Sequence, residues 1–149
     1  MGNTRTIENE KTRNIGFLIL RGGVGILFFI FGWMKFAGGE PLWQGVGSAM
    51  GTFGITAWPV FWGLLASAAE LLGGLLLALG LFTRFSAFSL VITMIVASAF
   101  KLSLGAGMAD FSAPFTMLLV MTFFLLAGGG VYSADHFLKL KKQQAAIAQ

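Results

Sequence analysis

Long apolar runs alternate with short polar segments along the chain of 149 residues. An α-helix rises about 1.5 Å per residue, so about 20 residues cross the roughly 30 Å hydrocarbon core of a bilayer. Runs of about this length occupy residues 15–36, 57–82, 85–104 and 111–132. The first is too long for the apolar part of a signal peptide and is expected to be retained. The pattern predicts an all-α integral membrane protein, a bundle of four transmembrane helices.

The polar segments divide the chain into three predicted parts. Residues 1–14 form a polar arm with partial disorder, residues 15–138 the membrane domain, and residues 139–149 a basic and polar tail. The loop between the first two spans is long and only weakly polar. Helical spacing of its apolar residues predicts a short helix lying at the membrane interface. These residues are Leu42, Val46, Ala49, Met50 and Phe53.

Composition supports the membrane assignment and limits the chemistry. Hydrophobic residues make up 56% of the chain and charged residues 11%, whereas a soluble domain carries about 25% charged residues. Cysteine is absent and His136 is the single histidine. This sequence therefore excludes thiolate catalysis, iron–sulfur ligation by cysteine and a histidine-based metal site within the membrane, and no metal site is expected.

Basic residues predict the topology. The net charge is +4, but these residues flank the apolar runs, so we do not expect nucleic-acid binding. The arm, the second turn and the tail hold most of them, and the opposite loops hold none apart from Lys35 and Lys101 at helix ends. The positive-inside rule therefore predicts that both termini are cytoplasmic.

Glu70 lies inside the second apolar run, close to the expected membrane midplane. A charge at that depth costs roughly 2.5–3.5 kcal/mol on insertion scales, and such residues are commonly paired or line a polar cavity. Counted along straight helices, Glu70 lies ~20 Å from the cytoplasmic side, Lys101 ~24 Å and Lys35 ~30 Å. Depth alone therefore favours Lys101 as the partner of Glu70, with Lys35 second.

Small and polar residues share one face on each of three spans. Spacings of three and four residues place them on single stripes, which allow helices to approach closely in lipid. The stripes are Arg21, Gly25, Phe28, Gly32 and Lys35 on the first span, Gly63, Ser67, Glu70 and Gly74 on the second, and Ser89, Thr93, Ala97 and Lys101 on the third. We expect these faces to point into the bundle.

Two candidate polar sites follow from these positions. In the outer half, Glu70, Lys101 and Lys35 form the first, with Trp58 and Trp62 as a possible aromatic wall; both tryptophans also suit an interfacial belt. At the cytoplasmic rim, Arg21, Arg84 and Asp135 form a predicted ion cluster. Either set could be a simple structural ion pair or clamp rather than a functional site.

Three segments resemble the DoxX family of small four-helix bacterial inner-membrane proteins: LRGGVGILFFIFGWMKF at residues 20–36, AELLGGLLLALGLFTRFSA at 69–87 and AGGGVYSADHFL at 127–138. The resemblance implies a redox role. Some relatives are subunits of thiosulfate:quinone oxidoreductases, and others associate with partners in oxidative-stress defence. The family's polar residues fall on Arg21, Lys35, Glu70, Arg84 and Asp135. The extra soluble domain of some sulfur-oxidising relatives is missing, which argues against thiosulfate oxidation by this chain alone.

Three functions remain open at this point. The first is a membrane subunit of a redox complex that binds a quinone beside Glu70, with no covalent cofactor and no self-contained enzymatic centre. The second is a structural or assembly subunit, and the third is a conduit for protons or a small solute. Beyond the lipid bilayer, we expect a protein partner or a second copy of the chain.

Overall fold

The computed structural model describes the backbone of residues 2–147 and the side chains of residues 8–147. Within this part the chain is helical and has no strand. The elements are α1 (Gly2–Ala37), α2 (Gly39–Gly47), the 3₁₀ helix η1 (Ser48–Phe53), α3 (Pro59–Leu79), α4 (Thr83–Ser103), α5 (Met108–Ala127) and α6 (Ala134–Ile147). Four of the described helices, α1, α3, α4 and α5, are long and apolar enough to cross a membrane. The predicted all-α architecture with four spans is confirmed.

The structure corrects the predicted end of the fourth span and shows helix at both ends of the described chain. The fourth span was expected to reach Tyr132, but α5 ends at Ala127 because Gly128 adopts φ 78° and ψ −160°, which only glycine tolerates. Residues 2–14 of the predicted arm belong to α1, which begins at Gly2. The tail, predicted to be basic and polar, lies in the separate helix α6 (Ala134–Ile147) up to Ile147.

Helices α1 and α3 are antiparallel and pack with their backbones in contact. A Cβ atom added at Gly32 would lie 2.6 Å from Leu71 Cα, and one added at Gly74 would lie 2.8 Å from the carbonyl carbon of Phe28. No larger residue fits either position without moving a helix. The small-residue stripes predicted on the first two spans are therefore the surfaces that join them, as expected where lipid provides no hydrophobic drive for association.

The predicted short helix of the first loop exists as α2, followed by η1. It packs on the start of α3 through two more glycines. A Cβ atom at Gly47 would lie 2.6 Å from the carbonyl carbon of Pro59, and one at Gly63 would lie 2.7 Å from Trp43 Cα. The indole nitrogen of Trp43 also donates to the carbonyl of Lys35, at 3.1 Å. These contacts fix α2 over the end of α1.

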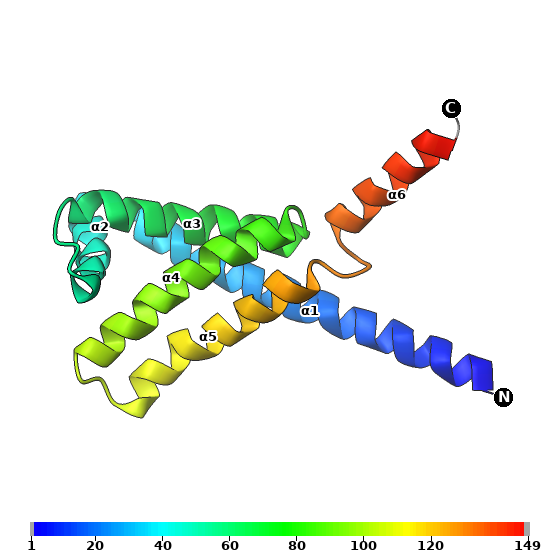
Figure 1. The fold of residues 1–149 in the computed structure, drawn as a ribbon, viewed down its shortest axis with the longest axis horizontal. Coiled ribbons are helices and arrows are strands. Elements are labelled where there is room, and N and C mark those ends of the chain that lie inside the picture. The colour runs from blue at the N-terminus through cyan, green and yellow to red at the C-terminus, as the bar shows by residue number, and fades with distance from the viewer. Residues whose placement is uncertain (1, 148–149) are drawn as a thin grey trace.

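The bundle is closed at one end and open at the other (Figure 1). Buried side chains from α1, α3, α4 and α5 form the core near the turn between α3 and α4. They are Val24, Phe28, Leu77, Ala87, Leu90, Met94, Met121 and Phe124. From that turn α3 and α4 diverge, so that the pair α1 and α3 separates from the pair α4 and α5 (Figure 1). Two cavities lined by Lys35 lie between the helices in this half of the bundle.

Candidate functional site

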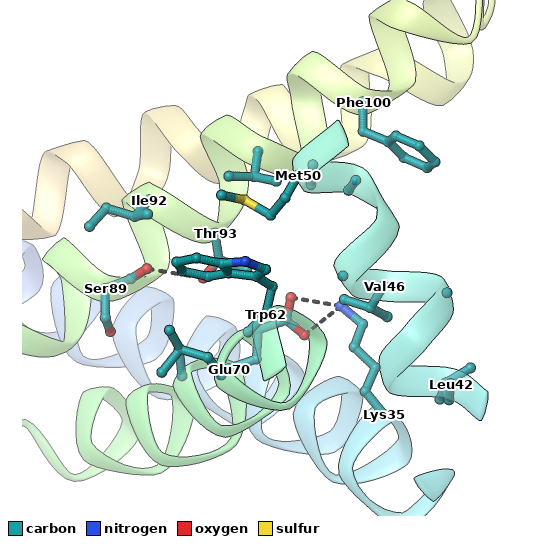
Figure 2. Close-up of a pocket in the computed structure, with 18 of the residues that line it drawn as sticks. Lys35, Leu42, Val46, Met50, Trp62, Glu70, Ser89, Ile92, Thr93 and Phe100 are labelled. Atoms are coloured by element: carbon teal, nitrogen blue, oxygen red, sulfur yellow. Dashed lines mark hydrogen bonds and ion pairs between the residues drawn. The ribbon is translucent and has the colours of Figure 1, made fainter. Parts of the chain in front are cut away.

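An ion pair joins α1 to α3 in the open half of the bundle. The Lys35 Nζ atom lies 2.6 Å from both carboxylate oxygens of Glu70. The Glu70 side chain is 2% exposed and that of Lys35 is 33% exposed. The pair is the one salt bridge found among residues 8–147. A buried carboxylate with a single bidentate partner is therefore the central feature of this region (Figure 2).

The prediction that Lys101 is the first partner of Glu70 is wrong. Depth was counted along straight, parallel helices, whereas the glycine contact between Gly32 and Leu71 sets the register of α1 on α3. One helical turn beyond Gly32, Lys35 lies opposite Glu70. Helix α4 meanwhile diverges from α3 toward its Lys101 end (Figure 1).

A cavity of about 620 Å³ opens beside the pair, between α3, α4 and the α2–η1 segment. Its wall is mainly apolar and includes Val46, Met50, Trp62, Ile92 and Phe100 (Figure 2). The polar side chains on the wall are Lys35, Glu70, Ser89, Thr93 and Lys101. An apolar cavity of several hundred Å³ with a few convergent polar groups is typical of a site for a small organic ligand.

The hydroxyl groups on α4 are engaged with their own helix. Ser89 Oγ donates to the Ser86 carbonyl at 2.8 Å, and Thr93 Oγ1 donates to the Ser89 carbonyl at 3.0 Å. Each hydroxyl oxygen keeps lone pairs that can accept a further hydrogen bond. The α4 wall therefore offers acceptors to a ligand, opposite the ammonium donor of Lys35.

A second cavity, of about 740 Å³, lies on the other side of the pair, between α1, α4 and α5. Its wall includes Phe31 of α1 and Pro114 and Met117 of α5. Four residues line both cavities: Lys35, Glu70, Ala97 and Lys101. The ion pair is therefore accessible from two directions.

The two tryptophans predicted as a wall have different positions. Trp62 lines the first cavity, and its indole nitrogen donates to the Ala57 carbonyl at 3.1 Å. Trp58 is 77% exposed and lines neither cavity. It precedes α3 with φ 55°, in the left-handed region. Trp58 as part of the wall is therefore a wrong prediction.

The first loop contributes to this site in a way that its sequence did not predict. Leu42, Val46, Ala49 and Met50 form part of the cavity wall. The helical spacing of these residues predicted a short helix, but it did not predict where that helix packs in the bundle. The signal that could have placed it is the pair Gly47 and Gly63, which permits the close contact between α2 and α3.

At the closed end, the predicted ion cluster binds backbone groups instead of forming ion pairs. Arg21 is 2% exposed and donates to the carbonyls of Gly129 and Tyr132, the latter at 2.9 Å. Arg84 donates to the Leu126 carbonyl at 3.2 Å. Helix ends leave such carbonyls without partners, and a guanidinium satisfies them well. Among the described side chains, these arginines make no salt bridge with Asp135.

Asp135 caps the start of α4. Its carboxylate oxygens accept from the Phe82 and Thr83 amides, at 2.8 and 2.9 Å, in the manner of an N-cap. Burial raises the pKa of Asp135, but hydrogen bonds from the amides of Thr83 and Phe82 and the positive charge of Lys139 outweigh it and hold the pKa below the ordinary value of 3.8. The cap is therefore electrostatically stabilised.

This lowered pKa predicts a pH dependence of stability. The ionised carboxylate stabilises the folded protein above the ordinary carboxyl pKa of about 4, and the contribution disappears as pH falls through the lowered folded-state pKa. Asp135→Asn, which mimics the protonated form, should lower the melting temperature at about pH 7, and this deficit should be smaller at about pH 3. Thermal unfolding in detergent at both pH values measures this. A difference in melting temperature between wild type and variant that is equal at both pH values would contradict the prediction. Asp110→Asn, on the exposed start of α5, is the control.

No group of three or more His, Cys, Asp or Glu side chains suited to a metal ion occurs among the described residues.

Comparisons with known proteins agree with the architecture. The family model DoxX matches residues 16–102, which is more than half of the chain. A protein of Bacillus subtilis (strain 168) named "Putative oxidoreductase CatD" is 29% identical over 139 residues, covering 93% of this chain and 98% of that relative. No solved structure matches the chain significantly. With four helices suited to span a membrane, this multi-pass membrane protein belongs to the DoxX family.

Proposed function

We propose that this protein is a membrane subunit of a redox complex and that its first cavity holds the ring of a quinone beside Lys35 and Glu70. The observation that carries the proposal is the position of the ion pair: it lies where two mainly apolar cavities meet, not sealed inside the core. A pair that only fastened two helices would need no such space. The name of the Bacillus subtilis relative, an oxidoreductase, supports the same class of function.

The wall residues suit the two forms of a quinone. The Lys35 ammonium can donate to a carbonyl oxygen of the oxidised ring, and the Glu70 carboxylate can accept from a hydroxyl of the reduced ring. A carboxylate in this position can also exchange protons with that hydroxyl. Trp62 and Ile92 supply apolar surface for the ring (Figure 2). Electrons would come from a partner protein, since the chain has no cysteine to ligate an iron–sulfur cluster.

The proposed setting is the bacterial inner membrane with both termini in the cytoplasm, as the distribution of basic residues predicts. The cavities then lie in the outer half of the bilayer. The second cavity, bounded by α1 and α5, provides room for the apolar tail of a lipid-soluble quinone.

Glu70→Gln tests the proposal. It keeps the size of the side chain and removes the charge that accepts from the reduced ring, so we expect at least a tenfold weaker affinity for decylubiquinol, the reduced form of decylubiquinone, in nanodiscs. A comparable loss of quinone-dependent activity in membranes is expected. Expression and folding should be retained because glutamine can still accept a hydrogen bond from Lys35. Glu40→Gln on α2 is the matched control, because Glu40 lines neither cavity. Unchanged affinity in a folded Glu70→Gln variant would refute the proposal.

A further inference from the structure

The region where the two cavities meet carries an excess positive charge. Lys35, Lys101 and Glu70 are the charged side chains that line the cavities, and all three line both. Two ammonium groups and one carboxylate give a net charge of +1. The charge of the carboxylate is already compensated, since both of its oxygens contact Lys35 Nζ at 2.6 Å.

Lys101 is the source of the excess charge. Among residues 8–147 it makes no ion pair. The other acidic residues at this end of the bundle, Glu40 and Asp110, do not line either cavity. Lys101 follows Ala97 by one helical turn on α4, and Ala97 also lines both cavities. The Lys101 side chain is exposed and lines both cavities, so its ammonium is available to a ligand where they meet.

An uncompensated cation beside apolar surface favours an anion. Charges attract more strongly where water is scarce, and the cavity walls are mainly hydrocarbon. A neutral ligand would leave the Lys101 ammonium without a counter-charge. A ligand with an ionised oxygen on an apolar body would pair with the ammonium and also pack against the apolar wall. The hydroxyl oxygens of Ser89 and Thr93 are acceptors and provide no competing charge.

From this geometry we infer that the site selects an amphiphile with an acidic oxygen, and that Lys101 is the residue that recognises the ionised form. The inference rests on the proposed function and specifies its ligand: an acidic quinone, such as one with a ring hydroxyl next to a carbonyl. A fatty acid has the same chemistry, an ionised oxygen on an apolar chain. Lys35 and Glu70 would position the rest of the head group.

The test compares two ligands with the same ring and apolar chain, of which only one is ionised. Lapachol, a 2-hydroxy-1,4-naphthoquinone that is ionised at neutral pH, and its O-methyl ether, which is not, are titrated into the full chain in phosphatidylcholine nanodiscs. Empty nanodiscs are subtracted to correct for partition into lipid. We expect the wild type to bind lapachol at least tenfold more tightly than the ether. Lys101→Gln should reduce this preference to twofold or less, and Lys139→Gln on α6 should leave it intact.

Two further arms separate the possible outcomes. Myristate and tetradecanol, compared in the same way, distinguish a fatty-acid site from a quinone site: stronger binding of myristate than of lapachol would assign the acidic oxygen to a fatty acid. Equal affinity for lapachol and its ether would overturn the inference. A preference for lapachol that persists in Lys101→Gln would also overturn the inference. Lys101 would then act only by stabilising the C-terminus of α4. If lapachol and its ether bind equally and Glu70→Gln still weakens the binding of decylubiquinol, the proposed function stands and only this inference falls.

Discussion

Replacement of Lys35 by methionine is expected to destabilise the folded protein strongly. Glu70 is 2% exposed and has Lys35 as its salt-bridge partner, so the substitution leaves a buried carboxylate without a counter-charge. Removing one member of a buried ion pair typically costs about 3–5 kcal/mol. Chemical unfolding in mixed micelles, followed by far-ultraviolet circular dichroism, measures the change.

The double variant Lys35→Met with Glu70→Leu is the informative companion. Replacing both partners by apolar residues removes the desolvation cost together with the attraction, and stability should return to within about 1–2 kcal/mol of the wild type. The proposed function nevertheless predicts that this stable variant binds decylubiquinone at least tenfold more weakly. A double variant that binds the quinone normally would show that the pair has only a structural role.

Gly32→Ala is expected to have the second largest effect. The added methyl carbon would lie 2.6 Å from Leu71 Cα and 2.7 Å from the carbonyl carbon of Glu70. Both neighbours are backbone atoms, so α1 and α3 must separate, and overpacking of this kind costs about 1–3 kcal/mol or more. Separation would also lengthen the contact between Lys35 and Glu70. We expect a lower melting temperature in detergent and a reduced yield of monodisperse protein on size-exclusion chromatography.

Gly23→Ala on the same helix is the matched control. Gly23 is exposed, and a Cβ atom added there meets nothing within 4 Å. Because alanine favours helix by about 1 kcal/mol over glycine, this variant should be as stable as the wild type or more so. Equal melting temperatures for the two glycine variants would contradict the close contact between α1 and α3.

The sequence predicted the spans and their contact faces because both depend on local pattern. Runs of apolar residues had to match the bilayer thickness, and the stripe through Gly25 and Gly32 had to face another helix because only a second backbone fills such a surface. The structure places Ala78 and Leu71 of α3 there. The short helix of the first loop followed from its spacing in the same way.

The partner of Glu70 could not be predicted because it depends on how the helices diverge. Depth along each helix is local, but the angle between α3 and α4 is a property of the whole bundle. Sequence reasoning also paired Arg21 with Asp135 by charge. In the structure both side chains bind backbone groups instead: Arg21 donates to the Gly129 carbonyl, and Asp135 accepts from the Thr83 amide. A sequence does not show which backbone groups lack a partner.

The most direct test of the central claim, that a quinone occupies the cavity beside Lys35 and Glu70, is photoaffinity labelling of the full chain in nanodiscs. An azidoquinone is photolysed with and without excess decylubiquinone, and the modified residues are mapped by mass spectrometry. The proposed site predicts competable adducts on cavity residues such as Met50, Trp62 and Val96. Adducts confined to exposed residues outside both cavities, such as Leu72 and Leu79, would contradict it.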